Sequence, residues 1–197
     1  MPTSSSRTMP RRHWFSKPYA DLMARLRVPA GFLLLGAFGW LARPTVNTLG
    51  IGLPISICGL ALRAWAAGHL AKNQKLAQSG PYAATRNPLY LGTLITAMGL
   101  AIAGDSVWLA ILFAVIFLLV YLPAIELEEQ HLMTILPGYP EFAARVPLLI
   151  PKWPGTTAEN PWGPDSFSSS LYLKNEEYKA LIGWLLGVMW LLLRYAL

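Results

Sequence analysis

Five long apolar stretches, separated by short polar segments, dominate this chain of 197 residues. A helix needs roughly 20 predominantly apolar residues to cross the hydrocarbon core of a bilayer, and most of these stretches approach that length. The pattern therefore predicts an all-α, polytopic membrane protein with about five transmembrane helices. The expected helices cover residues 28–42, 46–67, 89–103, 107–125 and 177–196.

The composition excludes the common soluble classes of protein. Hydrophobic residues make up 54% of the chain and charged residues only 13%, whereas a soluble domain carries about 25% charged residues. The net charge of +6 is too small and too scattered for a nucleic-acid-binding protein. The single cysteine, Cys58, lies in an apolar stretch, so we expect neither an intrachain disulfide nor a cysteine-ligated metal. No obligate protein partner is evident, and the expected partners are the lipid bilayer and a lipophilic small molecule.

Two of the apolar stretches are short. At 1.5 Å per residue, residues 28–42 or 89–103 would cover only about 22 Å of a core roughly 30 Å thick. To cross the core, these two helices must extend into their polar flanking residues; otherwise they enter and leave the membrane on the same side. Gly104-Asp105 leaves room only for a tight turn, so we expect residues 89–103 and 107–125 to form an antiparallel helical hairpin.

Basic residues predict the orientation of the chain. Residues 1–27 are polar and basic, and we interpret them as a cytoplasmic tail before a membrane domain over residues 28–197. With this tail inside, most Lys and Arg residues lie on the cytoplasmic side, as the positive-inside rule requires. Only Arg43 and Arg194 lie outside, and Arg63 lies within the second span. The C-terminus is then outside the membrane.

This orientation places the polar regions 69–88 and 126–177 together on the cytoplasmic side. The first contains Gly80-Pro81-Tyr82 and Arg86-Asn87-Pro88. Pro88 predicts a helix start, with the side chain of Asn87 capping a first-turn amide. Arg86 would lie at the mouth of this helix, where its guanidinium could reach a lipid phosphate or bind a carboxylate with its planar fork.

The second region contains a cluster of carboxylates, Glu126, Glu128 and Glu129, followed by His131. Like charges repel one another, and negative charge at a helix C-terminus is unfavourable. The cluster therefore suggests a site for a cation, although a solvated helix end or pairing with Lys72, Lys75 and Arg86 would also explain it. No second ligand cluster supports a metal, so an organic cation is preferred. Farther on, the apolar residues 148–150 between two prolines are expected to lie against the membrane surface or to close a pocket.

These motifs resemble the isoprenylcysteine carboxyl methyltransferase and phospholipid methyltransferase superfamily, including its bacterial integral membrane members. The resemblance covers residues 60–151, the motif core of the chain. It rests on Ala64-Trp65-Ala66-Ala67-Gly68-His69, Lys72-Asn73, Gly80-Pro81-Tyr82, Arg86-Asn87-Pro88, Tyr90, Gly92, Glu128-Glu129, Leu132, Tyr139, Phe142, Arg145-Val146-Pro147 and Pro151.

The resemblance implies a membrane-embedded S-adenosylmethionine site without a Rossmann domain, in a pocket on the cytoplasmic side. Asn87 stands where the family usually has a histidine. Glu128 and Glu129 would hold the cationic groups of the donor, Arg86 its carboxylate, and Tyr82 or Tyr90 its adenine. The residues assigned to the cofactor are Tyr82, Arg86, Asn87, Pro88, Tyr90, Gly92, Glu128, Glu129 and Leu132.

Arg86, Asn87 and Glu129 are the expected catalytic residues, and no metal ligands are predicted. Glu129 could also accept a proton from the nucleophile. Arg145 and Tyr121 are assigned to the methyl acceptor. The expected reaction is methyl transfer to a lipophilic acceptor: a prenylcysteine-like carboxylate, a lipid amine or a small isoprenoid. Two other functions stay open: an NADPH-dependent membrane reductase of the sterol type, and a small membrane transporter or scaffold without catalysis.

Overall fold

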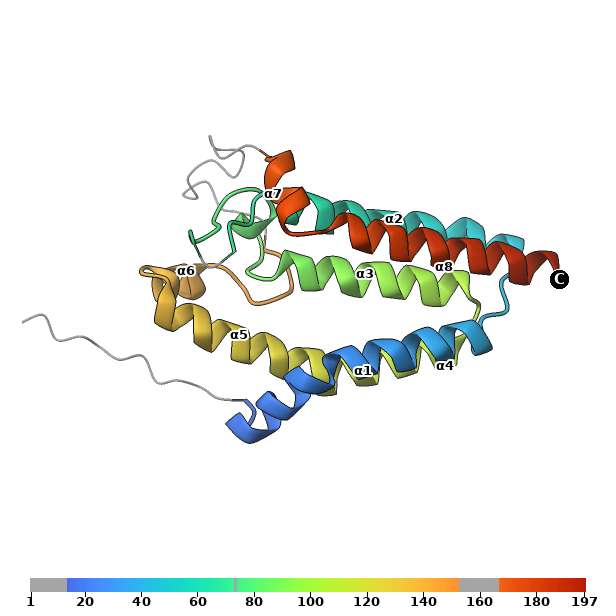
Figure 1. Cartoon of the computed structure of the whole chain (residues 1–197), viewed down its shortest axis with the longest axis horizontal. Coiled ribbons are helices and arrows are strands. Elements are labelled where there is room, and N and C mark those ends of the chain that lie inside the picture. Colours follow the sequence, from blue (N-terminus) through green and yellow to red (C-terminus); the bar gives the residue numbers. More distant parts are fainter. Residues whose placement is uncertain (1–13, 73, 153–166) are drawn as a thin grey trace, which may run out of the picture.

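The computed structural model describes residues 14–72, 74–152 and 167–197, and the regular elements within these ranges are all helical (Figure 1). The long helices are joined by short connections and a few short helical turns. The elements are α1 (Lys17–Leu41), α2 (Val46–Ala67), η1 (Gly80–Ala83), α3 (Pro88–Ala103), α4 (Val107–Ile116), η2 (Phe117–Tyr121), α5 (Leu122–Ile135), α6 (Tyr139–Arg145), α7 (Ser169–Lys174) and α8 (Tyr178–Ala196).

Among the described residues, four helices are long and apolar enough to cross a membrane: α1, α2, the continuous helix Val107–Ile135, and α8. The helix α3 is equally apolar in character but has only 16 residues. All five expected stretches are therefore helical, but only four of them have the length of a full span. These apolar helices identify an integral membrane protein.

Two helices extend beyond their apolar stretches. The helix α1 begins at Lys17 rather than at residue 28, so part of the expected polar tail is helical. Its polar end lies against α5: the backbone amides of Trp14 and Phe15 donate to the carboxylate of Glu126 at 2.9 and 3.2 Å. The fourth helix continues past residue 125 to Ile135, which carries the acidic cluster out of the apolar part of the bundle.

A π-helical turn, η2, joins α4 to α5. Pro123 follows this turn and has no N–H, so it cannot donate to the carbonyl of Leu119, four residues earlier. The hydroxyl of Tyr19 on α1 donates to that carbonyl at 2.9 Å. The contact both satisfies an exposed helix carbonyl and fixes α1 against the turn.

Glycines allow α2 and α3 to approach each other closely. A Cβ atom on Gly52 would lie 2.5 Å from the carbonyl oxygen of Gly99, and one on Gly59 would lie 2.4 Å from the backbone nitrogen of Thr96. Gly92 faces the same contact, since its Cβ would meet the backbone of Gly59 at 2.8 Å. Small residues that bring two backbones together are a common basis of helix association in membranes.

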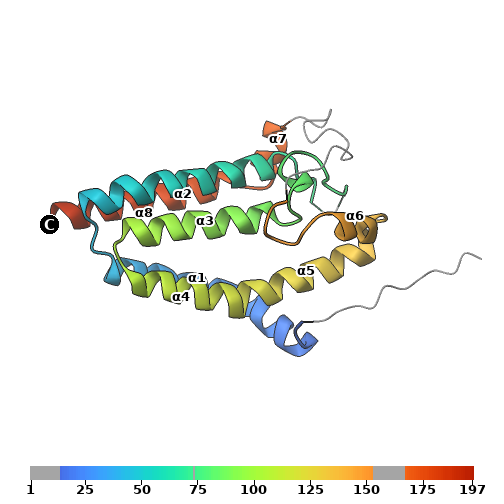
Figure 2. The same cartoon turned by 180° about the vertical axis from the view of Figure 1, so that it is seen from behind.

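The chain turns back after α3 at Gly104, and Asp105 takes a left-handed conformation with φ of 48°. The helix α4 then runs in the opposite direction to α3 and contacts it, so the expected hairpin is present (Figure 1). Seen from behind, α2, α3 and α8 form one group, and α1 lies with α4 (Figure 2). The helices α5 and α6 extend to the end of the bundle opposite the C-terminus (Figure 2). The candidate site lies at that end, where α3 begins.

Candidate functional site

The segment before α3 is held by the segment that follows α6. The amide of Arg86 donates to the carbonyl of Pro147 at 2.9 Å, and the amide of Lys152 donates to the carbonyl of Ala84 at 3.0 Å. The two segments therefore run side by side in opposite directions. The buried hydroxyl of Thr85 lies between them and donates to the carbonyls of residues 148 and 149.

Asn87 immediately precedes α3, which begins at Pro88 as the sequence predicts. Its side chain does not cap the helix, however, and this expectation is wrong. The side-chain amide instead donates to the carbonyl of Leu148 at 3.1 Å. Residues 147–149 are not part of a helix or sheet, so their carbonyls need other hydrogen-bond donors. The polar groups of residues 85–87 supply these donors.

Leu148 and Leu149 lie on the apolar helices beside the start of α3, whereas Ile150 is 81% exposed. Both arrangements expected for residues 148–150 stay predictions. Leu148 and Leu149 pack against a buried apolar cluster of Phe113, Phe117 and Ile125. Their side chains thus lie on apolar helices while their carbonyls bind the Arg86 segment.

A reversal of the chain brings α6 back onto α5. Gly138 has φ of 83°, a left-handed conformation that favours glycine, and α6 starts directly after it. Tyr139, only 3% exposed, is thereby placed to donate its hydroxyl hydrogen to Oε1 of Glu129 at 3.1 Å.

Arg86 and Glu129 form an ion pair between the start of α3 and the middle of α5. Arg86 Nε lies 3.2 Å from Glu129 Oε1, and the two side chains are 13% and 12% exposed. The distance is that of an ion pair, but Nε has no hydrogen-bond partner, because its N–H does not point at the oxygen. A buried guanidinium nitrogen with an unused hydrogen is costly unless a further acceptor reaches it.

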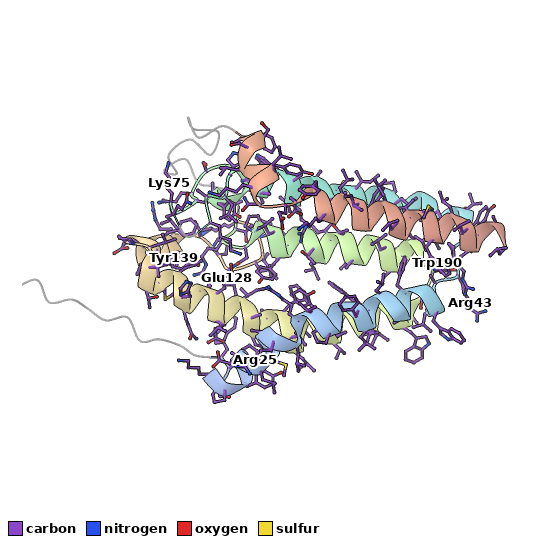
Figure 3. The ribbon with its side chains drawn as sticks, viewed as in Figure 1. Arg25, Arg43, Lys75, Glu128, Tyr139 and Trp190 are labelled. Carbon is purple, nitrogen blue, oxygen red and sulfur yellow. The ribbon has the colours of Figure 1, made fainter. Side chains whose placement is uncertain are left out.

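A second carboxylate is held next to this pair. The hydroxyl of Tyr90 donates to Glu128 Oε2 at 3.0 Å and accepts from Arg27 Nη1 at 3.1 Å. The ring of Tyr90 meets that of Tyr121 edge to face, with ring centres 6.3 Å apart. The side chains of Tyr139 and Glu128 lie at the same end of the bundle as Lys75, whereas Arg43 and Trp190 lie toward the other end (Figure 3).

Burial changes the acidity of two tyrosines at this end. It raises the pKa of Tyr139 well above its ordinary value, and the neighbouring carboxylate of Glu129 raises it further while Arg86 partly opposes the shift. Burial likewise raises the pKa of Tyr82, and the carboxylates of Glu128 and Glu177 add to the effect. Both hydroxyls are therefore neutral hydrogen-bond donors at any physiological pH.

The structure brings most of the predicted site residues together, and their functional roles stay predictions. Arg86, Asn87 and Glu129 meet around the 147–150 segment, and Tyr90, Tyr121 and Glu128 form a neighbouring group. Gly92 lies elsewhere, because it faces Arg63 and the backbone of α2. Arg145 is exposed in the last turn of α6, and Leu132 is half-buried on α5.

Sequence reasoning did not assign a role to three residues that support the site. Tyr139 was part of the motif pattern, and its position just after Pro137-Gly138 is a local signal that the chain folds back there. Thr85 and Arg27 carry no such signal, because their partners lie on segments far away in the sequence.

Comparison with known protein families gives one match. The sequence model of the phospholipid methyltransferase family matches residues 27–137, which is more than half of the chain. The match starts earlier than the motif core expected from the sequence and ends before the segment that contains Tyr139. No solved structure shows significant similarity to the chain.

Two curated relatives are similar to part of the chain. The cobalt-zinc-cadmium resistance protein CzcN of Cupriavidus metallidurans is 32% identical over 136 residues, which cover 66% of this chain and 62% of the relative. The nickel-cobalt-cadmium resistance protein NccN of Alcaligenes xylosoxydans xylosoxydans is 29% identical over 116 residues, covering 57% of this chain and 53% of the relative. The chain thus spans less than two thirds of either relative. By the match over residues 27–137, it belongs to the phospholipid methyltransferase family.

Proposed function

We propose that this protein transfers a methyl group from S-adenosylmethionine to a lipophilic acceptor at the membrane. The observation that carries the proposal is the buried pair of Arg86 and Glu129, held by Tyr139 in a family of membrane methyltransferases. The pair offers a cationic and an anionic group a few ångströms apart. The amino-acid part of S-adenosylmethionine carries an ammonium and a carboxylate, so it needs one protein group of each charge.

The residues present fit the charges of the donor. Nε of Arg86 is buried with no hydrogen-bond partner, and a carboxylate is the acceptor that best matches a guanidinium. Glu129 and the neighbouring Glu128 supply negative charge for the ammonium and sulfonium groups. Tyr82 and Tyr90 offer aromatic rings for the adenine at the same end of the bundle. Asn87, Pro88 and Leu132 would complete this binding surface.

When bound, S-adenosylmethionine supplies a methyl group that is already activated by a positively charged sulfur. The chain then has to bind, orient and exclude water rather than generate a nucleophile. Arg86 fixes the carboxylate end of the donor, and Glu129 balances the positive charge. Leu148 and Leu149 exclude water from the start of α3. Asn87 holds this closing segment through the carbonyl of Leu148, so it acts in orientation.

Proton handling falls to Glu129. If the acceptor is a lipid amine, its ammonium form must lose a proton before the nitrogen can attack the methyl group, and the carboxylate of Glu129 can take that proton. If the acceptor is a carboxylate, no proton has to move. We propose a prenylcysteine-like carboxylate, a lipid amine or a small isoprenoid as acceptor, with Tyr121 and Arg145 on the acceptor side.

The names of CzcN and NccN refer to resistance to metals. Over the described ranges of this chain, no group of three or more His, Cys, Asp or Glu side chains is placed to hold a metal ion. We propose that this chain shares a membrane methyltransferase fold with these relatives.

The test of the proposed function is a titration of the purified full chain with S-adenosylhomocysteine, the product of the donor. We expect the wild type to bind, and Glu129→Gln and Arg86→Ala to lose at least about tenfold in affinity, since each removes one charge of a buried pair. Glu141→Gln on the exposed side of α6 and Arg43→Ala at the opposite end are matched controls.

Absence of binding by the wild type would contradict the proposal, as would unchanged binding in both site variants. Arg86→Lys, which keeps the charge but loses the fork, covers the case in which Arg86→Ala fails to fold. A thermal shift with NADPH but none with S-adenosylhomocysteine would favour the reductase. Incubation with labelled S-adenosylmethionine and a total lipid extract would identify the acceptor.

A further inference from the structure

A second polar group lies within the helices, and the proposed function makes no use of it. We call it the Arg63 cluster; it consists of Arg63 on α2, Leu89 and Thr93 on α3, and Glu177 just before α8. Nε of Arg63 lies 2.5 Å from Glu177 Oε1, and Nη2 lies 3.1 Å from Oε2. The carboxylate is only 8% exposed. This bidentate pair is the strongest geometry available to two such groups.

The remaining nitrogen of Arg63 reaches α3. Nη1 donates to the hydroxyl of Thr93 and to the carbonyl of Leu89, the latter at 3.5 Å. The stem of Arg63 also fills the space beside Gly92, where a Cβ would lie 2.6 Å from Arg63 Cγ. One guanidinium therefore binds α2, α3 and the start of α8 together.

The cluster acts on the first turn of α3, which starts directly after the site residues. Leu89 is the second residue of α3, and Arg86 and Asn87 lie immediately before the helix. A shift of this turn relative to α2 and α8 would move Arg86 relative to Glu129. Tyr82 lies between the site and the Arg63 cluster, because the carboxylates of Glu128 and Glu177 are both close enough to raise the pKa of its hydroxyl.

We propose that Arg63 and Glu177 are a positioning pair for the methyl-donor site, which they hold in place through Thr93 and the first turn of α3. The inference rests on the proposed function and extends it to α8, which lies outside the region matched by the family. Neither residue needs to touch the donor. A pair that only stabilised the bundle would affect unfolding without affecting the affinity of the folded protein.

The decisive variant is Thr93→Val, which removes the hydroxyl that Arg63 binds on α3 but keeps the ion pair and the side-chain shape. Glu177→Gln removes the charge of the partner. Their matched controls are Thr96→Val, one turn later on α3 with its hydroxyl bound to its own helix, and Glu176→Gln, exposed and paired with Lys179. The measurement is the Kd for S-adenosylhomocysteine below the unfolding temperature, with the thermal midpoint recorded in parallel.

We expect Thr93→Val and Glu177→Gln to raise the Kd about two- to thirtyfold, the range typical of residues that act on a site through packed neighbours. The two controls should bind as the wild type does. If Glu177→Gln does not fold, Thr93→Val decides, because it leaves the ion pair intact. Unchanged affinity in Thr93→Val, with or without a lower thermal midpoint, would overturn the inference. Absence of binding by the wild type itself would overturn the proposed function, and this inference with it.

Discussion

The hydroxyl of Tyr139 donates a hydrogen bond of 3.1 Å to Oε1 of Glu129, across the reversal between α5 and α6. The same oxygen lies 3.2 Å from Nε of Arg86. Residues of two segments, one before α3 and one in α6, therefore meet at a single carboxylate oxygen. The arrangement orients the charge before any ligand arrives, which lowers the cost of binding.

Removing this hydrogen bond should weaken donor binding. In Tyr139→Phe the ring keeps its packing, but Glu129 loses a donor worth about 1.5–3 kcal/mol for a charged acceptor. We expect the Kd for S-adenosylhomocysteine to rise about tenfold or more, measured by titration. Tyr195→Phe, exposed near the end of α8, is the control and should bind as the wild type does. Equal affinities in the two variants would show that the hydroxyl does not orient Glu129.

Alkaline pH should destabilise the protein. Burial and the neighbouring Glu129 raise the pKa of Tyr139 in the folded state, whereas the unfolded tyrosine has its ordinary pKa of about 10. Above that pH the unfolded state loses its proton first, so stability is complete below about pH 10 and falls as the pH rises further. Thermal unfolding in detergent between pH 8 and 11 measures the decline. Tyr139→Phe should show a shallower decline, and an identical slope would contradict this assignment.

Asn87 should contribute to stability through the 147–150 segment. Asn87→Ala removes one donor to the carbonyl of Leu148, which keeps only the longer contact from the hydroxyl of Thr85. We expect a loss of about 0.5–1.5 kcal/mol in the free energy of unfolding, the net contribution of one hydrogen bond. Asn47→Ala, exposed in the first turn of α2, serves as the control. Proteolysis provides a second measurement, because cleavage near residue 150 should be faster in Asn87→Ala; equal rates would argue against the contact.

The contact between α2 and α3 should not tolerate a single added methyl group. In Gly59→Ala the new Cβ would lie 2.4 Å from the backbone nitrogen of Thr96, so the helices must separate. Such overpacking costs about 1–3 kcal/mol. Gly50→Ala on the same helix has no atom within 4 Å of the new group and should unfold at the wild-type temperature or above. A wild-type midpoint for Gly59→Ala would mean that the helices pack less tightly than described.

Local signals in the sequence predicted several helix ends correctly. The helix α2 has the bounds expected from its apolar stretch, and in the structure Thr45 and Thr48 form a capping box at its start. Pro88 marks the start of α3, and Gly104-Asp105 marks its end. Each of these signals acts within a few residues, so the sequence is sufficient to find it.

The start of α1 could not be predicted in this way. Residues 17–27 are too charged to belong to an apolar stretch, and they are held in place by distant groups such as the carbonyl of Leu119. Direct pairing of the acidic cluster with Arg86 was only the alternative to a cation site, but the closeness of Arg86 and Glu129 was expected, because both were placed in polar regions on the same side of the membrane. The pairing of Arg63 with Glu177 was not, since neither residue carries a local pattern that points to the other.

The distance in sequence between Arg63 and its partner has a consequence for biosynthesis. Arg63 leaves the ribosome 114 residues before Glu177. While the intervening helices enter the membrane, the guanidinium of Arg63 is present but the carboxylate of Glu177 has not yet been made. We expect the segment around Arg63 to stay accessible to water until residue 177 has been made. The ion pair that joins α2 to the start of α8 is therefore a late event in assembly.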